Sequence, residues 1–127
     1  DLVMVEYAQL EPFTREGASV IRSSSGQTTQ GWFSGIPILD LVYMFSGSSL
    51  PKQIIAEASD GYQVIYTLDW LEQQEGTWIL AWGNEDGLLD LSQGPFRSVS
   101  IGDPPPITEG RRSARQVIRI IFGDSIL

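Results

Sequence analysis

The clearest pattern of apolar and polar positions lies in residues 38–45, directly after Gly35-Ile36-Pro37. Apolar residues recur there at positions i, i+3, i+4 and i+7, which places them on one face of a helix that packs on a core. Pro37 suits the first helical position, because its missing N–H group has no helical partner there in any case. Gly47 is a typical residue for the end of such a helix. We therefore predict an amphipathic helix whose buried face is formed by Ile38, Leu41, Val42 and Phe45.

Shorter apolar runs predict strands that are separated by turns. Two of these runs are joined by Ser59-Asp60-Gly61, and Asp-Gly between apolar runs is a strong signal for a hairpin. A second, short helix is expected over residues 68–74, with Thr67 or Asp69 near its start. The predicted strands cover residues 2–5, 18–21, 52–58, 62–66, 77–82, 96–101 and 116–122. Many short strands with one or two short helices indicate an α+β fold with a mixed β-sheet core.

The segments without apolar periodicity are expected to be loops or turns. They are residues 11–14, 23–31, 84–87 and 104–106. The chain of 127 residues fits one domain, which we expect to span residues 1–127. Its longest apolar stretches are far shorter than the ~20 residues that a membrane-spanning helix needs. No membrane insertion is therefore expected.

The chain is acidic, with 16 Asp and Glu residues against 8 Lys and Arg residues and a net charge of -8. A nucleic-acid-binding protein needs a cationic surface that displaces counterions from phosphates, so this balance argues against a nucleic-acid partner. The same reasoning argues against binding to anionic membrane surfaces. The composition is that of a soluble globular domain, and it is compatible with both a cytoplasmic and an extracytoplasmic location.

The chain contains no histidine and no cysteine. This absence excludes Ser-His-Asp triads, cysteine nucleophiles, zinc sites built from His and Cys, and iron–sulfur clusters. What remains is carboxylate chemistry, metal binding by oxygen ligands, a site based on Lys or Tyr, or a cofactor held by hydrogen bonds. We predict no catalytic residue and no metal ligand.

Four segments, taken in order, resemble motifs of one known family. They are Trp32–Leu41, Ser59–Tyr62, Gly94–Arg97 and Ser113–Ile120. Their order and spacing resemble the molybdopterin-binding domain of sulfite oxidase, plant nitrate reductase and the bacterial methionine-sulfoxide reductase catalytic subunit. The similarity spans roughly residues 18 to 122. It implies a small version of the sulfite-oxidase-like fold.

The resemblance also implies cofactor-binding residues. Arg97 matches the arginine of the Gly-Pro-x-Arg motif, which in the family contacts the phosphate-bearing part of the pterin. Arg115 matches the lysine of the Ser-Ala-Lys motif and keeps its charge. Tyr62, in the Asp-Gly-Tyr motif, and Ser92, near the place of a family histidine, complete the expected set. A guanidinium group suits this task, because it pairs with phosphate oxygens through two parallel hydrogen bonds.

The chain departs from the family where the molybdenum is bound. The family has its metal-ligating cysteine upstream of the Trp-x-x-Gly element, and this chain has Val20–Ser25 in that region. A serine is a far poorer ligand than a thiolate for a metal that is held by sulfur. We therefore expect no bound cofactor, with molybdopterin as the alternative.

Three interpretations of the function stay open at this point. The first is a non-catalytic relative of these domains that binds a ligand or has a structural role, with another protein or a larger assembly as its partner. The second is a minimal oxidoreductase domain that binds molybdopterin without a protein thiolate. The third is an extracellular module that binds a ligand or a carbohydrate through exposed tryptophans.

Some residues allow both a structural and a functional interpretation. The four tryptophans form either a sugar-binding platform or part of the core, and packing is the commoner role. The acidic segment 84–90 lacks the ligand spacing of a calcium loop and is expected to be a solvated turn. The basic cluster contains Arg111, Arg115 and Arg119, which would share one side of a strand as an anion site or as an exposed face.

Overall fold

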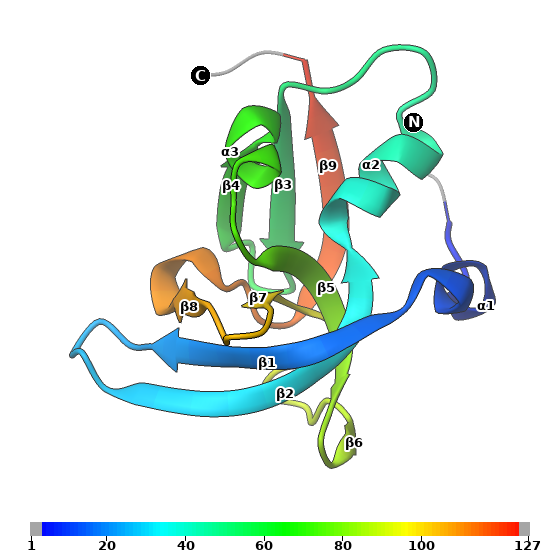
Figure 1. The fold of residues 1–127 in the computed structure, drawn as a ribbon. Coiled ribbons are helices and arrows are strands. Elements are labelled where there is room, and N and C mark those ends of the chain that lie inside the picture. Colours follow the sequence, from blue (N-terminus) through cyan, green and yellow to red (C-terminus); the bar gives the residue numbers. More distant parts are fainter. Residues whose placement is uncertain (1–3, 125–127) are drawn as a thin grey trace.

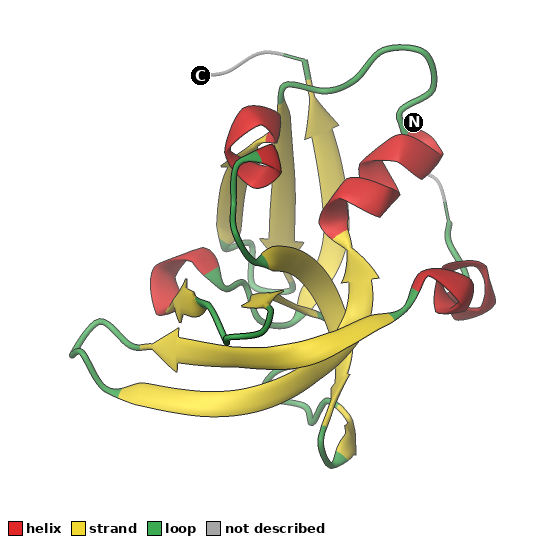
Figure 2. Cartoon of the chain, viewed as in Figure 1, coloured by secondary structure: helices red, strands yellow, loops and turns green. Residues whose placement is uncertain are grey.

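The computed structural model describes residues 4–124, which form two β-sheets with short helices at their periphery (Figures 1 and 2). The larger sheet has the strand order β6-β5-β2-β1-β8, and β7 also pairs with β5. Its strands are β1 (Arg15–Arg22), β2 (Thr28–Pro37), β5 (Thr77–Asn84), β6 (Gly87–Leu88), β7 (Arg97–Ile101) and β8 (Ile107–Glu109). The smaller sheet has the order β4-β3-β9. Its strands are β3 (Gln53–Ala58), β4 (Gln63–Thr67) and β9 (Val117–Gly123).

The helical segments are short. They are α1 (Tyr7–Leu10), α2 (Ile38–Phe45), α3 (Leu68–Glu72) and the 3-10 turns η1 (Glu11–Phe13) and η2 (Gly110–Arg112). The predicted α+β class with mixed sheets is confirmed. None of the helices in residues 4–124 has the length and apolar character needed to cross a membrane.

Helix α2 confirms the amphipathic pattern, with Ile38, Leu41 and Val42 buried. Pro37 differs from its predicted place, because it is the last residue of β2 and the N-cap of α2. The chain thus passes directly from strand to helix, and the rigid Pro37 backbone sets the direction of that change. The predicted short helix is also present as α3, where the Thr67 hydroxyl accepts a hydrogen bond from the N–H of Trp70 at 3.2 Å.

The predicted hairpin at Ser59-Asp60-Gly61 is confirmed between β3 and β4. Gly61 has a φ of 92°, a left-handed conformation that side chains disfavour, which explains the glycine at this turn. The turns predicted at residues 84–87 and 104–106 are also present, at the β5–β6 connection and before β8.

The polar loop predicted at residues 23–31 was wrong in its second half. Thr28 to Gly31 pair with Arg22 to Ser19, so β1 and β2 form the long hairpin at the bottom of Figure 1. Residues 28–30 are exposed in this hairpin, and a strand without a buried face has no apolar alternation to detect.

Two predictions near the N-terminus also need correction. The strand expected at residues 2–5 lies partly outside the described residues, and its described part, Met4 and Val5, is in no strand. The loop expected at residues 11–14 contains the 3-10 turn η1.

The core has two parts, separated by the central strand β5. Trp78, Leu80 and Trp82 on one face of β5 join the main cluster with α2 and the smaller sheet, while Ile79 and Ala81 on the other face pack with Phe33 and Val99. Because both faces of β5 are covered, its sequence is a continuous apolar run without polar alternation. Trp70, Trp78 and Tyr66 form an aromatic group with ring centroids 5.3 to 6.0 Å apart. The packing role is thus confirmed for these tryptophans and Trp82, whereas Trp32 is 44% exposed.

Tyr66 is the largest fully buried side chain in residues 4–124, and its hydroxyl lies in a hydrogen-bond network. The Oη atom lies 2.7 Å from Ser98 Oγ and also donates to the carbonyl of Arg112. Burial, chiefly, raises the pKa of Tyr66 well above its usual value.

The variant Tyr66→Phe should therefore be destabilised in a pH-dependent way. At about pH 8 we expect the free energy of unfolding to fall by about 1–3 kcal/mol, because Ser98 Oγ and the carbonyl of Arg112 lose the tyrosine hydroxyl as a partner. Above about pH 10 the unfolded native chain ionises this tyrosine while the folded chain keeps it neutral, so the native protein loses about 1.4 kcal/mol per pH unit that the variant does not lose. Urea unfolding of both proteins at about pH 8 and about pH 11 measures this. A stability difference that stays constant over this range would contradict the assignment.

Candidate functional site

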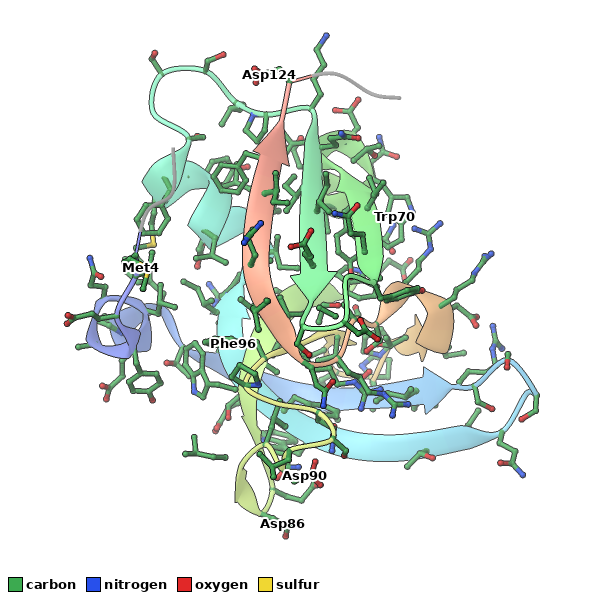
Figure 3. All side chains as sticks on the ribbon, turned by 180° about the vertical axis from the view of Figure 1, so that it is seen from behind. Met4, Trp70, Asp86, Asp90, Phe96 and Asp124 are labelled. Carbon is green, nitrogen blue, oxygen red and sulfur yellow. The ribbon has the colours of Figure 1, made fainter. Side chains whose placement is uncertain are left out.

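Three segments that are distant in the sequence border an open depression of ≈ 380 Å³. The end of β3 and the β3–β4 turn contribute Ala58, Asp60 and Tyr62, the segment before β7 contributes Ser92, and the stretch between β8 and β9 contributes the other four residues. The residues of that stretch are Gly110, Ser113, Arg115 and Gln116. The structure thus brings together three of the four residues that the sequence nominated, Tyr62, Ser92 and Arg115. In Figure 3 the segment that carries Asp90 and Phe96 crosses below the smaller sheet.

Arg97, the fourth nominated residue, does not line the depression but lies behind its wall. The side chain is only 7% exposed, with Nε donating to Ser113 Oγ at 2.9 Å and Nη1 donating to Gln93 Oε1 at 2.8 Å. Its guanidinium carbon also lies 6.0 Å from the ring centre of Phe33. Burial, and secondarily the positive charge of Arg115, lowers the pKa of Arg97 to about 10. Arg97 therefore adds positive charge beneath Ser113 and fixes the position of that residue.

Neither Arg97 nor Arg115 forms an ion pair with any residue that the structure describes. The ion pairs within residues 4–124 are Arg22–Glu109 and Arg119–Glu57. A buried charge usually has a partner, because desolvation without one is expensive. An unpaired Arg97 beside Arg115, in a chain with 16 carboxylates, is therefore notable. Within residues 4–124, neither charge is neutralised by a carboxylate through an ion pair.

The polar groups of the depression are partly engaged. Asp60 Oδ1 accepts the N–H of Tyr62 at 2.9 Å within the hairpin turn, so this carboxylate closes the turn and makes no ion pair with Arg115. The Tyr62 hydroxyl donates to the carbonyl of Arg111 at 3.2 Å. The Ser92 hydroxyl donates to Asp90 Oδ1 at 2.6 Å, and this hydrogen bond lowers the pKa of Asp90. Arg115 is the cation of the depression that is exposed.

A buried hydrogen-bond network holds the wall that carries Ser113 and Arg115. Ser98 is its centre: its Oγ accepts the N–H of Ala114 at 2.8 Å and lies 2.7 Å from the Tyr66 hydroxyl. The carbonyl of Ser98 accepts the Ser113 hydroxyl at 2.6 Å. Sequence reasoning missed Ser98, and its place next to the Gly-Pro-x-Arg motif, one residue after Arg97, was the available signal.

Gln116 joins the three segments of the site. Its N–H donates to the carbonyl of Gln93 at 2.8 Å, its carbonyl accepts the N–H of Ser59 at 3.0 Å, and its side chain donates to the carbonyl of Leu91 at 2.6 Å. Gln116 also has a φ of 52°, which is uncommon for a residue with a side chain. Such strain, of order 1–3 kcal/mol, persists only where the surroundings fix it and is concentrated at functional sites. Sequence reasoning did not identify this residue.

The predicted basic face of a strand is wrong. Arg111 lies in η2 and Arg115 in the connection that follows, and only Arg119 lies in β9, where it pairs with Glu57 at 3.4 Å. The chain turns at η2, so the alternation of a strand does not apply to it. Arg112, also in η2, lies over the ring of Trp70 at 4.6 Å.

The donor set of the site fits a phosphate-bearing ligand better than a redox metal. Residues 23–25, near the place of the family's cysteine, lie in the turn at the tip of the β1–β2 hairpin and do not line the depression. The chain has no thiolate or imidazole, and residues 4–124 contain no cluster of three carboxylates that could hold a metal ion. A molybdopterin molecule would therefore find Arg115 for its phosphate and no protein ligand for its metal.

Replacing the buried Arg97 with methionine should leave the protein at least as stable as before. Methionine keeps most of the volume and removes a desolvated charge that has no ion-pair partner, so we expect a neutral or stabilising change. Ser113 keeps its hydrogen bond to Ser98, so no buried hydroxyl loses its last partner. Urea unfolding of Arg97→Met and native protein measures the difference. A loss of more than about 2 kcal/mol would show that Arg97 is retained for stability.

We compared the chain with known proteins. No model of a known protein family matches it. No curated protein matches it either. The resemblance to the molybdopterin-binding domain thus stays a prediction from the four sequence segments.

Proposed function

We propose that this chain is a non-catalytic binding domain related to the molybdopterin-binding domains of the sulfite oxidase family. Its ligand is a phosphate-bearing small molecule that binds in the depression next to Arg115. The observation that carries the proposal is the buried, unpaired Arg97 directly behind the exposed Arg115. Retaining an unpaired charge in the interior costs stability, and an anionic ligand would offset that cost.

The charge distribution supports the proposal. Arg97, Arg111, Arg112 and Arg115 are half of the eight cations of the chain, and they lie in or beside the depression and η2. The net charge of -8 would repel a free anion, so this local concentration of cations is needed for anion binding. The volume of ≈ 380 Å³ is in the range of small-molecule sites.

The positions of the resembling segments support the family relation. Ser59–Tyr62 forms the β3–β4 turn, Gly94–Arg97 leads into β7, and Ser113–Ile120 leads into β9. These three of the four segments border the depression or supply the charge behind it, whereas Trp32–Leu41, in β2 and α2, does not line it. A family whose motifs bind one cofactor requires such convergence. The sulfite-oxidase-like version of the α+β fold is part of this proposal.

A titration of the protein with pyrophosphate, followed by calorimetry, tests the binding function. We expect one-to-one binding that weakens as the salt concentration rises, because salt screens the attraction between Arg115 and the ligand. Methylphosphonate, which carries less charge, serves as the matched weaker ligand. The absence of any pyrophosphate binding at low salt would refute the proposed anion site.

Metal analysis separates this proposal from a minimal molybdopterin-dependent oxidoreductase. The protein would be produced in a host that makes the molybdenum cofactor and then analysed for molybdenum, pterin fluorescence and electron transfer from sulfite or to a sulfoxide. We expect no stoichiometric molybdenum and no turnover, since no thiolate is present to anchor the metal. Stoichiometric molybdenum together with turnover would favour the oxidoreductase and contradict the non-catalytic role.

A further inference from the structure

A second depression, of ≈ 490 Å³, lies at the start of β1 in the larger sheet and shares no lining residue with the anion site. Its walls come from the start of β1, from Trp32 of β2, from Thr77 at the start of β5, from Ile101 at the end of β7 and from Gly102, Asp103 and Pro105 after it. The proposed function makes no use of this depression.

Trp32 is the tryptophan that the core leaves free. It is 44% exposed, whereas Trp78 and Trp82 are 6% and 7% exposed and lie in the main core cluster. The backbone N–H of Trp32 donates to Glu85 Oε2 at 2.8 Å, so its strand is tied to the β5–β6 turn. Trp32 thus lines the depression from a strand that is held in place, and its exposed side chain suits a stacking surface.

Two glycines let the start of β1 and the segment after β7 pack closely at this depression. A side-chain carbon at Gly17 would come within 3.3 Å of the Ile101 Cβ atom, and one at Gly102 within 3.3 Å of Pro106. The N–H of Gly102 donates to the carbonyl of Ala18 at 3.1 Å, which joins the two walls. These two segments are therefore held together where, with Trp32, they line the depression.

The charged groups around this depression are of both signs. Arg15, Glu16 and Asp103 line the depression, all are exposed, and none forms an ion pair within residues 4–124. The two carboxylates disfavour an anionic ligand, and Arg15 offsets part of their attraction for a cationic one. Exposed acceptors and donors together suit a neutral ligand with many hydroxyl groups. An aromatic ring adds a surface for an apolar C–H face, and a sugar ring presents both features.

We infer that this depression binds a sugar unit of a neutral glycan, with the ring stacked on Trp32 and its hydroxyl groups bonded to Asp103, Glu16 and Arg15. The inference is independent of the anion site, because the two sites share no residue. Trp70, Trp78 and Trp82 pack in or against the main core cluster and take no part in it, so Trp32 is the one stacking residue of this proposal.

The test is a titration of the full chain, labelled with 15N, with cellotetraose, maltotetraose, laminaritetraose and chitotetraose in turn. At least one sugar should shift the indole N–H resonance of Trp32. The affinity should fall at least about tenfold in Trp32→Ala, as is usual for a central aromatic contact, and should largely return in Trp32→Tyr. The variant Arg115→Ala, at the other site, should bind the sugar like the native protein.

Asp103→Asn is a second variant that keeps the test decisive if Trp32→Ala does not fold. It should weaken the binding severalfold, because the sugar loses the carboxylate to which its hydroxyl groups are bonded. The variant should still fold, because an exposed loop carboxylate can be replaced without disturbing the core. The inference is overturned if none of the four sugars shifts the Trp32 resonance. It is also overturned if a sugar binds and neither variant changes its affinity.

Discussion

Replacing Gly35 with alanine should prevent the chain from folding stably. The added Cβ atom would lie 2.2 Å from the carbonyl oxygen of Leu80 and 2.5 Å from the Cα atom of Ala81. Both are backbone atoms of the central strand β5, so no side chain can move aside. We expect a loss of more than about 4 kcal/mol, which is exceptional for one substitution and comparable with the whole stability of a small domain.

The reason lies in the pairing of β2 with β5. The register shifts between Ser34 and Gly35, and the two backbones come very close at this irregularity. Gly17→Ala is the matched control, because the added carbon would lie 3.3 Å from the side chain of Ile101 and should change stability by less than about 1.5 kcal/mol. Circular dichroism and urea unfolding measure both variants. A Gly35→Ala protein that unfolds like Gly17→Ala would show that the β2–β5 contact is misplaced.

Replacing Arg115 with alanine should remove most of the pyrophosphate affinity. Losing a charge-assisted contact costs about 1.5–3 kcal/mol of binding free energy, which corresponds to a dissociation constant that is roughly 10- to 150-fold larger. Arg115 is exposed and makes no ion pair with the described residues, so the stability of the protein should stay within about 0.5 kcal/mol.

Arg111→Ala is the matched control for this prediction. Arg111 is also exposed and lies in η2, but it does not line the depression. Its removal lowers the local charge by the same amount without removing a contact, so the affinity should fall by less than about threefold. Equal losses in the two variants, measured by calorimetry, would mean that the binding is a diffuse electrostatic effect and that the depression is not its site.

The parts of the fold that sequence could predict are those with a local signal. The stripe of residues 38–45 and the Asp60-Gly61 turn each carry their own pattern within a few residues, and both are confirmed. The start of β2 could not be found this way, because Thr28, Thr29 and Gln30 are all exposed and this part of the strand has no buried face. Strands β6 and β8 have two and three residues, too few for any periodicity.

The sequence could predict which residues belong to the site but not how they are arranged in space. Tyr62, Ser92 and Arg115 were nominated from motifs, and the structure places them at one depression. The alternation that put Arg111 and Arg119 on one strand face failed, because η2 turns the chain before β9 begins. The network of Tyr66 with Ser98 joins residues 32 positions apart, and no short sequence pattern reports such a contact.

The most unusual feature of the site is that the buried Arg97 has no ion pair within residues 4–124. The protein keeps a guanidinium group at 7% exposure with hydrogen bonds to Ser113 and Gln93 and no ion pair within residues 4–124. A group that lowers stability is expected where it serves binding, because natural proteins accept local cost at functional sites. Arg97→Met thus tests the effect of the buried charge on stability, and Arg115→Ala tests the exposed contact with the ligand.

The most direct test of the anion site is to map pyrophosphate binding on the amide resonances of the 15N-labelled protein. The account predicts that the largest shifts fall on the three segments that border the depression, at Asp60 to Tyr62, at Ser92 and at Gly110 to Gln116. Shifts that are absent, or that fall mainly on residues outside these segments, would contradict it.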